Sequence, residues 1–337
     1  MVKYILKRIA LMVLILFGVT VLVFFISHLV PSDPVAANLS SAAMQDQDIV
    51  NAYRAKWGLD KPLPLQYFVY LKNLLHGDLG TSIRTGNAVA DDLKLYFPAT
   101  AELAICSIIV AAIFGIVFGV LSAVFRNRGI DYVVRTISVA GVSVPSFWFA
   151  IMMLFIFYYK LKIFPGPGRL DSRMTHPSGG TGFYLLDGLL SGNMTLFTNA
   201  LSHLILPAFV LGFFTMGLIA RQMRSNLLEV LSKDYIRTAK SKGLNSEQVV
   251  MKHAFGNALI PVVTVIGMGF CNLLGGTVMI EQIFSWPGIG QYAYQSAVNL
   301  DFPAICGVAI VTACVYVIVN LVIDLLYGLI DPRIRYQ

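Results

Sequence analysis

The sequence predicts an all-α membrane protein with six transmembrane helices. Two compositional observations indicate this class: 57% of the 337 residues are hydrophobic, and only 13% are charged. An ordinary soluble domain has about 25% charged residues, so the excess apolar surface is expected to face lipid. A backbone that crosses lipid must satisfy its own hydrogen bonds, which favours helices. The third observation is that the apolar residues form long runs of about spanning length: Ile9–Val30, Ala101–Phe125, Thr136–Tyr158, Leu204–Ala220, Ala258–Ile280 and Ala304–Ile330.

The first run follows Lys3, Lys7 and Arg8, and basic residues before an apolar run also occur in signal peptides. Val35-Ala36-Ala37 even resembles a small-residue cleavage site. The hydrophobic region of a signal peptide has about 7–15 residues, and Ile9–Val30 is longer. We therefore expect a retained first helix.

The net charge of +7 is unevenly distributed. If the N-terminus is cytoplasmic, most Lys and Arg residues fall in short inner segments, and the others are spread over longer outer loops. This bias fits the positive-inside rule and predicts that both termini are cytoplasmic. Nucleic-acid binding would need a solvated basic face with base-reading residues, and is not expected.

The polar segments predict the organisation of the chain. We expect residues 1–30 to hold the N-terminal cytoplasmic end and the first span, and residues 331–337 to be a cytoplasmic C-terminus. Residues 98–330 would form the main transmembrane domain, with a polar loop at 225–258. Residues 31–97 would form an external helical segment with two amphipathic helices. Gly58 and Pro62 would end the first helix, and Gly77 would end the second. The Gly- and Pro-rich region 165–199 predicts an external loop with little regular structure.

Features inside the spans suggest a transporter. Gly115 and Gly119 are four residues apart, a spacing that allows close helix approach. Pro145 and Pro207 should bend the third and fourth spans, although ordinary bundle packing explains each proline equally well. Ionisable residues in the spans lie near helix ends, whereas ion-coupled transporters usually need them near the membrane midplane; these residues are Glu102, His203, Glu281 and Asp324. An external energy source is therefore expected.

Motifs for catalysis or metal binding are lacking in the sequence. There is no GxxxxGK[ST] phosphate loop, no HExxH and no GxSxG. The cysteines have no metal-ligand spacing and lie within the apolar runs, where they are expected to be small core residues; they are Cys106, Cys271, Cys306 and Cys314. The five histidines are scattered and suit structural or surface roles.

A polar island, residues 231–257, separates the fourth and fifth runs. Its first half has helical spacing of apolar residues on a basic helix, and Gly243 offers a C-terminal stop. Glu247 to Phe255 predicts a second short helix, before Pro261 opens the fifth span. An amphipathic helix resting on anionic lipid would give the same periodicity, so the pattern alone leaves both interpretations open.

The run Asp234-Tyr235-Ile236-Arg237-Thr238-Ala239-Lys240-Ser241-Lys242-Gly243 resembles the cytoplasmic coupling loop of ABC importer permeases. Within that family it is similar to the dipeptide/oligopeptide/nickel branch. The general pattern has Glu-Ala-Ala, three residues and Gly, and here Arg237, Thr238 and Ala239 hold the first three positions. The missing acid departs from the general pattern but matches this branch. Pro261 also lies further from Gly243 than in many importers.

Two further segments carry the resemblance, which covers nearly the whole chain. Gly77-Asp78-Leu79-Gly80-Thr81-Ser82 resembles an external signature after the first span. The segment from Glu281 to Gly290 resembles the one between spans five and six; in it, Pro287-Gly288 would make a turn and Trp286 would suit the membrane interface. The ending Asp331-Pro332-Arg333-Ile334-Arg335 also matches. The first of the two permease subunits of dipeptide importers is the most similar type.

The resemblance implies a type I importer fold and a non-catalytic subunit in the bacterial cytoplasmic (inner) membrane. It implies that the loop docks on an ATPase through Tyr235, Arg237, Thr238, Ala239, Lys240, Lys242 and Gly243. The external signature residues would be Gly77, Asp78, Gly80, Ser82, Trp286, Pro287 and Gly288. No substrate-binding residue and no metal ligand follows from the resemblance.

The implied partners are a second homologous permease subunit, two cytoplasmic ATP-binding subunits, an external substrate-binding protein and membrane lipid. ATP and Mg²⁺ would be bound by the ATPases, and this chain would bind no cofactor. Dipeptides are the first expectation for the substrate, with oligopeptides, glutathione, nickel chelates and haem as alternatives. A secondary transporter or channel, or an intramembrane enzyme, would be a different class of protein.

Overall fold

The computed structural model describes residues 2–29, 43–174, 179–276 and 278–330. Within these residues helices are the only regular structure, apart from one isolated β-bridge between Thr81 and Ala88. The expected all-α class is confirmed. The family-like ending at Asp331–Arg335 and the proposed cleavage site at residues 35–37 lie outside the described residues.

The chain divides into two compact units. Unit one comprises Met1–Pro98 and Gly288–Ile318, and unit two comprises Ala99–Pro287 and Val319–Gln337. Two long helices, α5 (Val89–Val124) and α15 (Phe302–Ile330), pass from one unit into the other.

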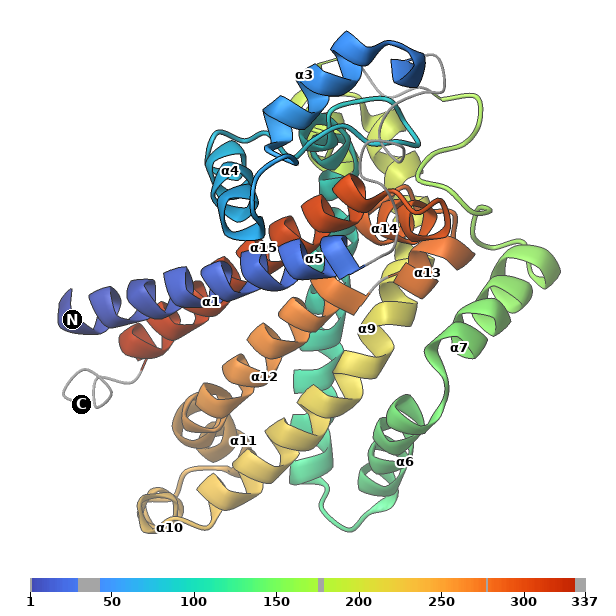
Figure 1. The fold of residues 1–337 in the computed structure, drawn as a ribbon. Coiled ribbons are helices and arrows are strands. Elements are labelled where there is room, and N and C mark those ends of the chain that lie inside the picture. Colours follow the sequence, from blue (N-terminus) through green and yellow to red (C-terminus); the bar gives the residue numbers. More distant parts are fainter. Residues whose placement is uncertain (1, 30–42, 175–178, 277, 331–337) are drawn as a thin grey trace. The chain divides into compact units, whose positions relative to one another are not determined.

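Unit one contains the N-terminal helix and two short amphipathic helices. Its elements are α1 (Val2–Leu29), the 3₁₀ helix η1 (Ala43–Gln45), α3 (Gln47–Trp57), α4 (Leu63–Leu75), the start of α5, α14 (Ile289–Val298) and most of α15 (Figure 1).

The short helices of unit one end where the sequence predicts. The Asp46 side chain caps α3 by accepting from the N–H groups of Asp48 and Ile49, which have no partner within the helix. Gly58, with φ +66°, ends α3 in the left-handed conformation, and Gly77, with φ +81°, follows α4.

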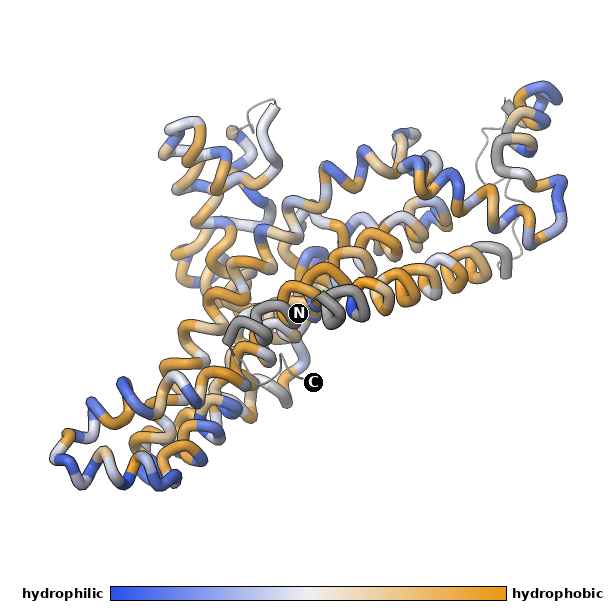
Figure 2. The backbone as a smooth tube through the Cα atoms, turned by 90° about the vertical axis from the view of Figure 1, so that its left-hand side faces the viewer, coloured by the Kyte–Doolittle hydropathy of each residue, from blue (hydrophilic) through white to orange (hydrophobic). Residues whose placement is uncertain are grey.

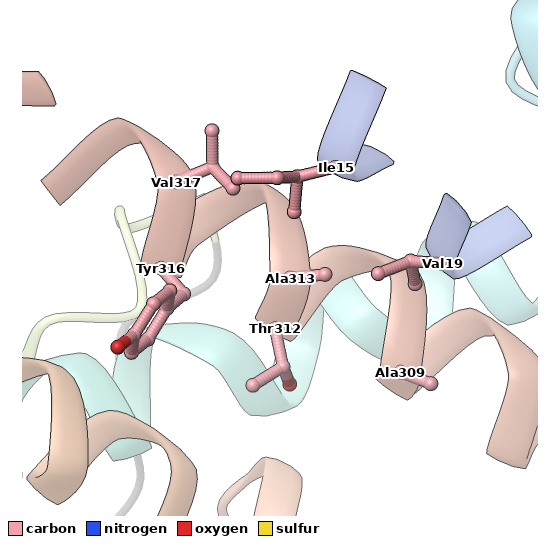
Figure 3. A pocket seen from close by; sticks show the side chains of 7 residues that line it. All are labelled: Ile15, Val19, Ala309, Thr312, Ala313, Tyr316 and Val317. Atoms are coloured by element: carbon pink, nitrogen blue, oxygen red, sulfur yellow. The ribbon is translucent and has the colours of Figure 1, made fainter. Parts of the chain in front are cut away.

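Helices α1 and α15 line a shared hollow in unit one with small and apolar side chains. Ile15 and Val19 of α1 and Ala309, Ala313 and Val317 of α15 line a mostly apolar cavity of about 430 Å³ (Figure 3). The remaining lining residues are Thr312 and Tyr316. Apolar lining fits helices that share a lipid environment.

Unit two is built around the long helix α9 (Met194–Leu231), which lies beside α12 (Phe255–Gly276) and α6 (Gly129–Ser143) (Figure 1). Its other elements are α7 (Ser146–Met153), the π-helix η2 (Leu154–Lys160), α8 (Tyr184–Leu190), α10 (Asp234–Ser241), α11 (Ser246–Gln248), the π-helix η3 (Val249–Ala254), α13 (Val278–Ile283) and the ends of α5 and α15.

Five described helices are long and apolar enough to cross a membrane, and there are six if a bent helix pair is counted as one span. That pair is the expected third span: Gly129–Gly141 and Ser146–Lys160 differ in direction by 108°. Pro145 explains the break, because the residue before a proline avoids helical geometry and Val144 is extended. The fourth span, in contrast, continues through Pro207 as one helix.

Two expectations about loops are wrong. Residues 165–199, expected to be irregular, contain α8 and the first turns of α9. The carboxylate of Asp187 accepts hydrogen bonds from the Thr181 and Gly182 N–H groups, which holds the preceding turn against α8. The short helix expected at Glu247 to Phe255 is not separate, since α11, η3 and α12 follow one another without a break.

Glycines allow α5 to approach α9 closely, as the four-residue spacing predicts. A Cβ atom on Gly115 would lie 2.7 Å from Ile219 Cβ, and one on Gly119 would lie 2.6 Å from Met223 Cβ. Gly217 of α9 similarly faces the backbone of Ser138 in α6. These contacts fix the position of α9, whose far end continues into the polar island.

Candidate functional site

The polar island folds as a short helix, α10, at the end of α9. Asp234 lies in its first turn and Lys240 in its last, the placement that the helix dipole favours. Ile236 and Ala239 are buried, and they belong to the same hydrophobic cluster as Val249 and Ala254 of η3. This apolar side attaches α10 to unit two and leaves its polar side in solvent.

A hydrogen bond connects α10 to the start of α12. The Asn257 amide donates to Tyr235 Oη at 2.9 Å, and the Asn226 amide of α9 donates to the Ala258 carbonyl at 3.3 Å. The first bond therefore holds α10 to α12, and the second holds α12 to α9.

Gly243 ends the helical turn with a conformation that favours glycine. Its φ is +83°, and its N–H donates to the Lys240 carbonyl at 3.0 Å. A Cβ atom there would meet no heavy atom within 4 Å. The requirement for glycine thus comes from the backbone alone.

The solvent side of α10 is basic. Arg237 is 78% exposed in its side chain, and its ion pair with the exposed Asp234 is long, at 3.5 Å. Lys240 and Lys242 are exposed and make no ion pair with any residue that the structure describes. The structure thus brings six of the seven expected coupling residues to the exposed surface of the loop, with Ala239 on the buried side; Figure 2 shows the hydrophilic residues gathered there.

The Gly77–Ser82 segment forms a tight cap within unit one. Gly77 and Gly80 both have positive φ, and Asp78 Oδ1 accepts from the Gly80 N–H at 3.0 Å. Ser82 Oγ donates to Asp301 Oδ2 at 2.5 Å, which ties this turn to the start of α15.

A second buried carboxylate, Asp92, completes this cap. Its oxygens accept from Thr85 Oγ1 at 2.5 Å, Asn87 Nδ2 at 3.1 Å and Tyr292 Oη at 3.0 Å. Burial, together with Asp92, raises the pKa of Tyr292 above its ordinary value, so its hydroxyl remains a donor. The expected signature segment thus lies against a small helical core in unit one, with Asp92 and Asp301 as carboxylates that the sequence did not single out.

Trp286 is buried, so the expectation that it lies at the membrane interface is wrong. It is 1% exposed, and its Nε1–H donates to the Ala99 carbonyl at 2.9 Å in unit two. The turn also falls three residues earlier than Pro287-Gly288, at Phe284 and Ser285, where Ser285 has φ +47°. Gly288 instead precedes α14 in an extended conformation.

Arg169 is the centre of a buried polar cluster beside Trp286. Its guanidinium lies 3.5 Å from the centre of the Tyr184 ring and 5.5 Å from that of Trp286. It donates to Glu102 Oε2 at 2.6 Å, with both side chains almost fully buried. The other Glu102 oxygen accepts from the Leu185 N–H at 2.8 Å.

Two more contacts hold residues 161–174 in unit two. His203 is within hydrogen-bonding distance of the Gly168 carbonyl and of Asp171, at 3.0 and 3.2 Å. Hydrogen bonds from Asn199 and His203 lower the pKa of Asp171 below its ordinary value. The buried Glu281 accepts from Thr100 Oγ1 at 2.6 Å, so Glu102 and Glu281 both serve as structural acceptors.

A third cluster lies at the other end of α9. Asp131, fully buried, accepts two hydrogen bonds from Arg224, at 2.8 and 2.9 Å, and one each from Ser122 and the Asn127 N–H. This bidentate pair clamps α6 to α9. The sequence did not reveal this pair, because its signal there is a single acid, Asp131, among the basic residues of segment 126–135.

Metal binding has no candidate in the described part of the chain, where no three His, Cys, Asp or Glu side chains are grouped to hold an ion. The site instead consists of a basic helix on the surface, with buried ion pairs in the unit that carries it. An exposed basic helix of this kind is suited to binding a partner.

Long apolar helices and a basic interhelical loop define a multi-pass membrane protein. Residues 115–336 match the family described as binding-protein-dependent transport system inner membrane component, and residues 1–104 match its N-terminal family. The chain belongs to this family of ABC importer permeases. The resemblance seen in the sequence is confirmed.

Individual relatives cover nearly all of the chain. It is 50% identical over 323 residues, 96% of this chain and 94% of the relative, to the probable D,D-dipeptide transport system permease protein DdpB of Escherichia coli strain K12. It is 42% identical, over the full length of both chains, to the di/tripeptide transport system permease protein DppB of Pseudomonas aeruginosa. The dipeptide permease DppB of E. coli strain K12 is 38% identical, again over both full lengths.

Proposed function

We propose that this chain is a permease subunit of an ATP-driven importer of dipeptides. Family membership supports transport that depends on a binding protein, and the printed names of the relatives support a dipeptide substrate. The chain would form half of the pathway, with a second homologous permease forming the other half. It would lie in the bacterial cytoplasmic membrane with both termini inside.

The observation that carries the proposal is the basic surface of α10. Arg237, Lys240 and Lys242 are exposed and have no strong partner within the described residues, while Ile236 and Ala239 fix the helix to unit two. A helix anchored on one side and cationic on the other suits docking on an acidic cleft. The partners at this surface would be two cytoplasmic ATP-binding subunits.

ATP and Mg²⁺ would be bound by those partners, and this chain would supply no catalytic group. Closure of the ATPase pair would move α10, and the bond from Asn257 to Tyr235 would pass the movement to α12. An external binding protein would deliver the peptide. Coupling of this kind requires the two states of the permease to bind the ATPases with different affinities.

The test measures ATP hydrolysis and dipeptide uptake separately, with the full complex in proteoliposomes. Arg237→Glu should lower ATP-driven uptake about tenfold, within the usual range of coupling energies, because it reverses a charge at the docking surface. Lys94→Glu is the matched control: Lys94 is equally exposed and its reversal breaks only a surface pair with Asp91. Equal uptake by the two variants would contradict the role of α10.

Gly243 gives a second, independent variant pair. Gly243→Pro should uncouple hydrolysis from uptake, because proline fixes φ near −65° and the site needs +83°. Gly243→Asn should retain uptake, since asparagine tolerates the left-handed conformation.

Uptake driven by an ion gradient, without ATPases, would instead identify a secondary transporter.

A further inference from the structure

A small cavity in unit two lies beside the Asp131–Arg224 clamp. Its volume is about 280 Å³, and helices α5, α6 and α9 line it. Three arginines, Arg135, Arg221 and Arg224, reach it, and its other walls include Val134, Val139 and Ala220. The cavity therefore combines a cationic part with an apolar part.

The arginines outnumber the acid that faces them. Arg224 makes two hydrogen bonds to Asp131, and Arg135 approaches the same carboxylate at 3.3 Å. Arg221 makes no hydrogen bond or ion pair with any residue that the structure describes. One carboxylate cannot balance three guanidinium groups, so the cavity keeps an excess of positive charge.

The cavity lies where α9 leaves its apolar run, since Arg221 directly follows Leu204–Ala220. The guanidinium of Arg135 also sits 4.8 Å from the centre of the half-exposed Tyr132 ring, and tyrosine is common at the level of lipid headgroups. An anion bound here would touch water on one side and hydrocarbon on the other. A soluble anion gains nothing from the apolar walls, whereas a phospholipid can fill both parts.

We propose that this cavity is a binding site for the phosphate group of an anionic phospholipid. Arg221 and Arg135 would bind the phosphate oxygens, and Val134, Val139 and Ala220 would contact the first methylene groups of the chains. Basic pockets between membrane helices are suited to such headgroups. The proposal does not depend on which solute the protein carries.

The test uses the full importer complex in nanodiscs of phosphatidylglycerol and phosphatidylcholine, with native mass spectrometry after partial delipidation. Arg221→Gln should weaken retention of one phosphatidylglycerol about fivefold, and Arg135→Gln should do the same, which is the usual effect of one basic residue near a lipid surface. Arg126→Gln is the control, because Arg126 is an exposed cation on the neighbouring turn that does not line the cavity. Arg224 is left intact because it holds the fold.

Three outcomes would overturn the proposal. The first is equal phosphatidylglycerol retention by the Arg221→Gln and Arg126→Gln variants. The second is displacement of the lipid by millimolar inorganic phosphate, which would indicate a site for soluble anions. The third is unchanged lipid retention with weaker binding of the ATPase subunits, which would make Arg221 part of a protein interface.

Discussion

Individual buried carboxylates brace this protein, and Asp131 accepts hydrogen bonds from Arg224, Ser122 and the Asn127 N–H. Asp131→Asn would leave Arg224 without its counter-ion while keeping the side-chain volume. Breaking a buried pair in this way should lower the free energy of unfolding by about 3 kcal/mol. Thermal or detergent-induced unfolding of the purified protein measures the change.

Asp91→Asn is the control for that measurement, because Asp91 forms an exposed pair with Lys94 at 2.9 Å. Surface pairs contribute about 0–1 kcal/mol. If both variants unfold alike, the clamp between α6 and α9 has no special role in stability.

Asp171 predicts a pH dependence at the residue scale. Its pKa is lowered in the folded protein by hydrogen bonds from Asn199 and His203, so its ionised form stabilises the fold above the unfolded pKa of about 3.9. This stabilisation is lost as the pH falls through the lower, folded pKa. Melting temperatures of the wild type should therefore drop more steeply below about pH 4 than those of Asp171→Asn; parallel curves would contradict the assignment.

The sequence predicts a feature of the site well when the residues that form it are close together in the chain, and poorly when they are far apart. Gly243 could be predicted because a helix stop is a local property, and its φ of +83° agrees. Trp286 could not, because its partner, the Ala99 carbonyl, is 187 residues away. The same holds for Arg169 and Glu102, which are 67 residues apart. A residue type and its neighbours in sequence do not reveal a distant counter-ion.

At the scale of helix packing, the contact of α5 with α9 is one of the closest approaches in the described residues. Gly119→Ala would place a Cβ atom 2.6 Å from Met223 Cβ and 2.8 Å from the Ala220 carbonyl, which is backbone and cannot move freely. Overpacking of this kind should cost about 2 kcal/mol. The melting temperature of the purified protein reports it.

Gly256→Ala is the matched control for this prediction. Gly256 also lies in a helix, but a Cβ atom there meets no heavy atom within 4 Å. Alanine should stabilise that helix by about 0.5–1 kcal/mol. A destabilised Gly256→Ala variant would mean that the method responds to any change in a helical glycine.

Helix identity was more predictable than helix boundaries. The apolar runs located the spans, because lipid exposure leaves a compositional signal along the chain. They did not reveal that α9 extends to Leu231 or that α6 and α7 differ by 108° in direction. Those features depend on tertiary contacts, such as the clamp at Asp131, and on the geometry before Pro145.

For the whole molecule, the distribution of charge predicts which side of the membrane each polar segment faces. In a variant whose native cysteines are replaced by serine, Ser241→Cys on α10 should react with a membrane-impermeant maleimide only from the cytoplasmic side. Lys72→Cys on α4 should react only from the outside. Both positions are exposed in the structure. Labelling of both from one side would contradict the proposed topology.

Helix α9 links the two ends of unit two without interruption. It has 38 residues, which at 1.5 Å per residue is about 57 Å. Near its start His203 touches the loop at Gly168, and its last turn leads into α10. Because glycines of α5 and α9 bring neighbouring backbones into direct contact along this rod, it has little freedom to flex independently. A force applied at one end of α9 is therefore expected to displace the opposite end, rather than to bend the helix between them.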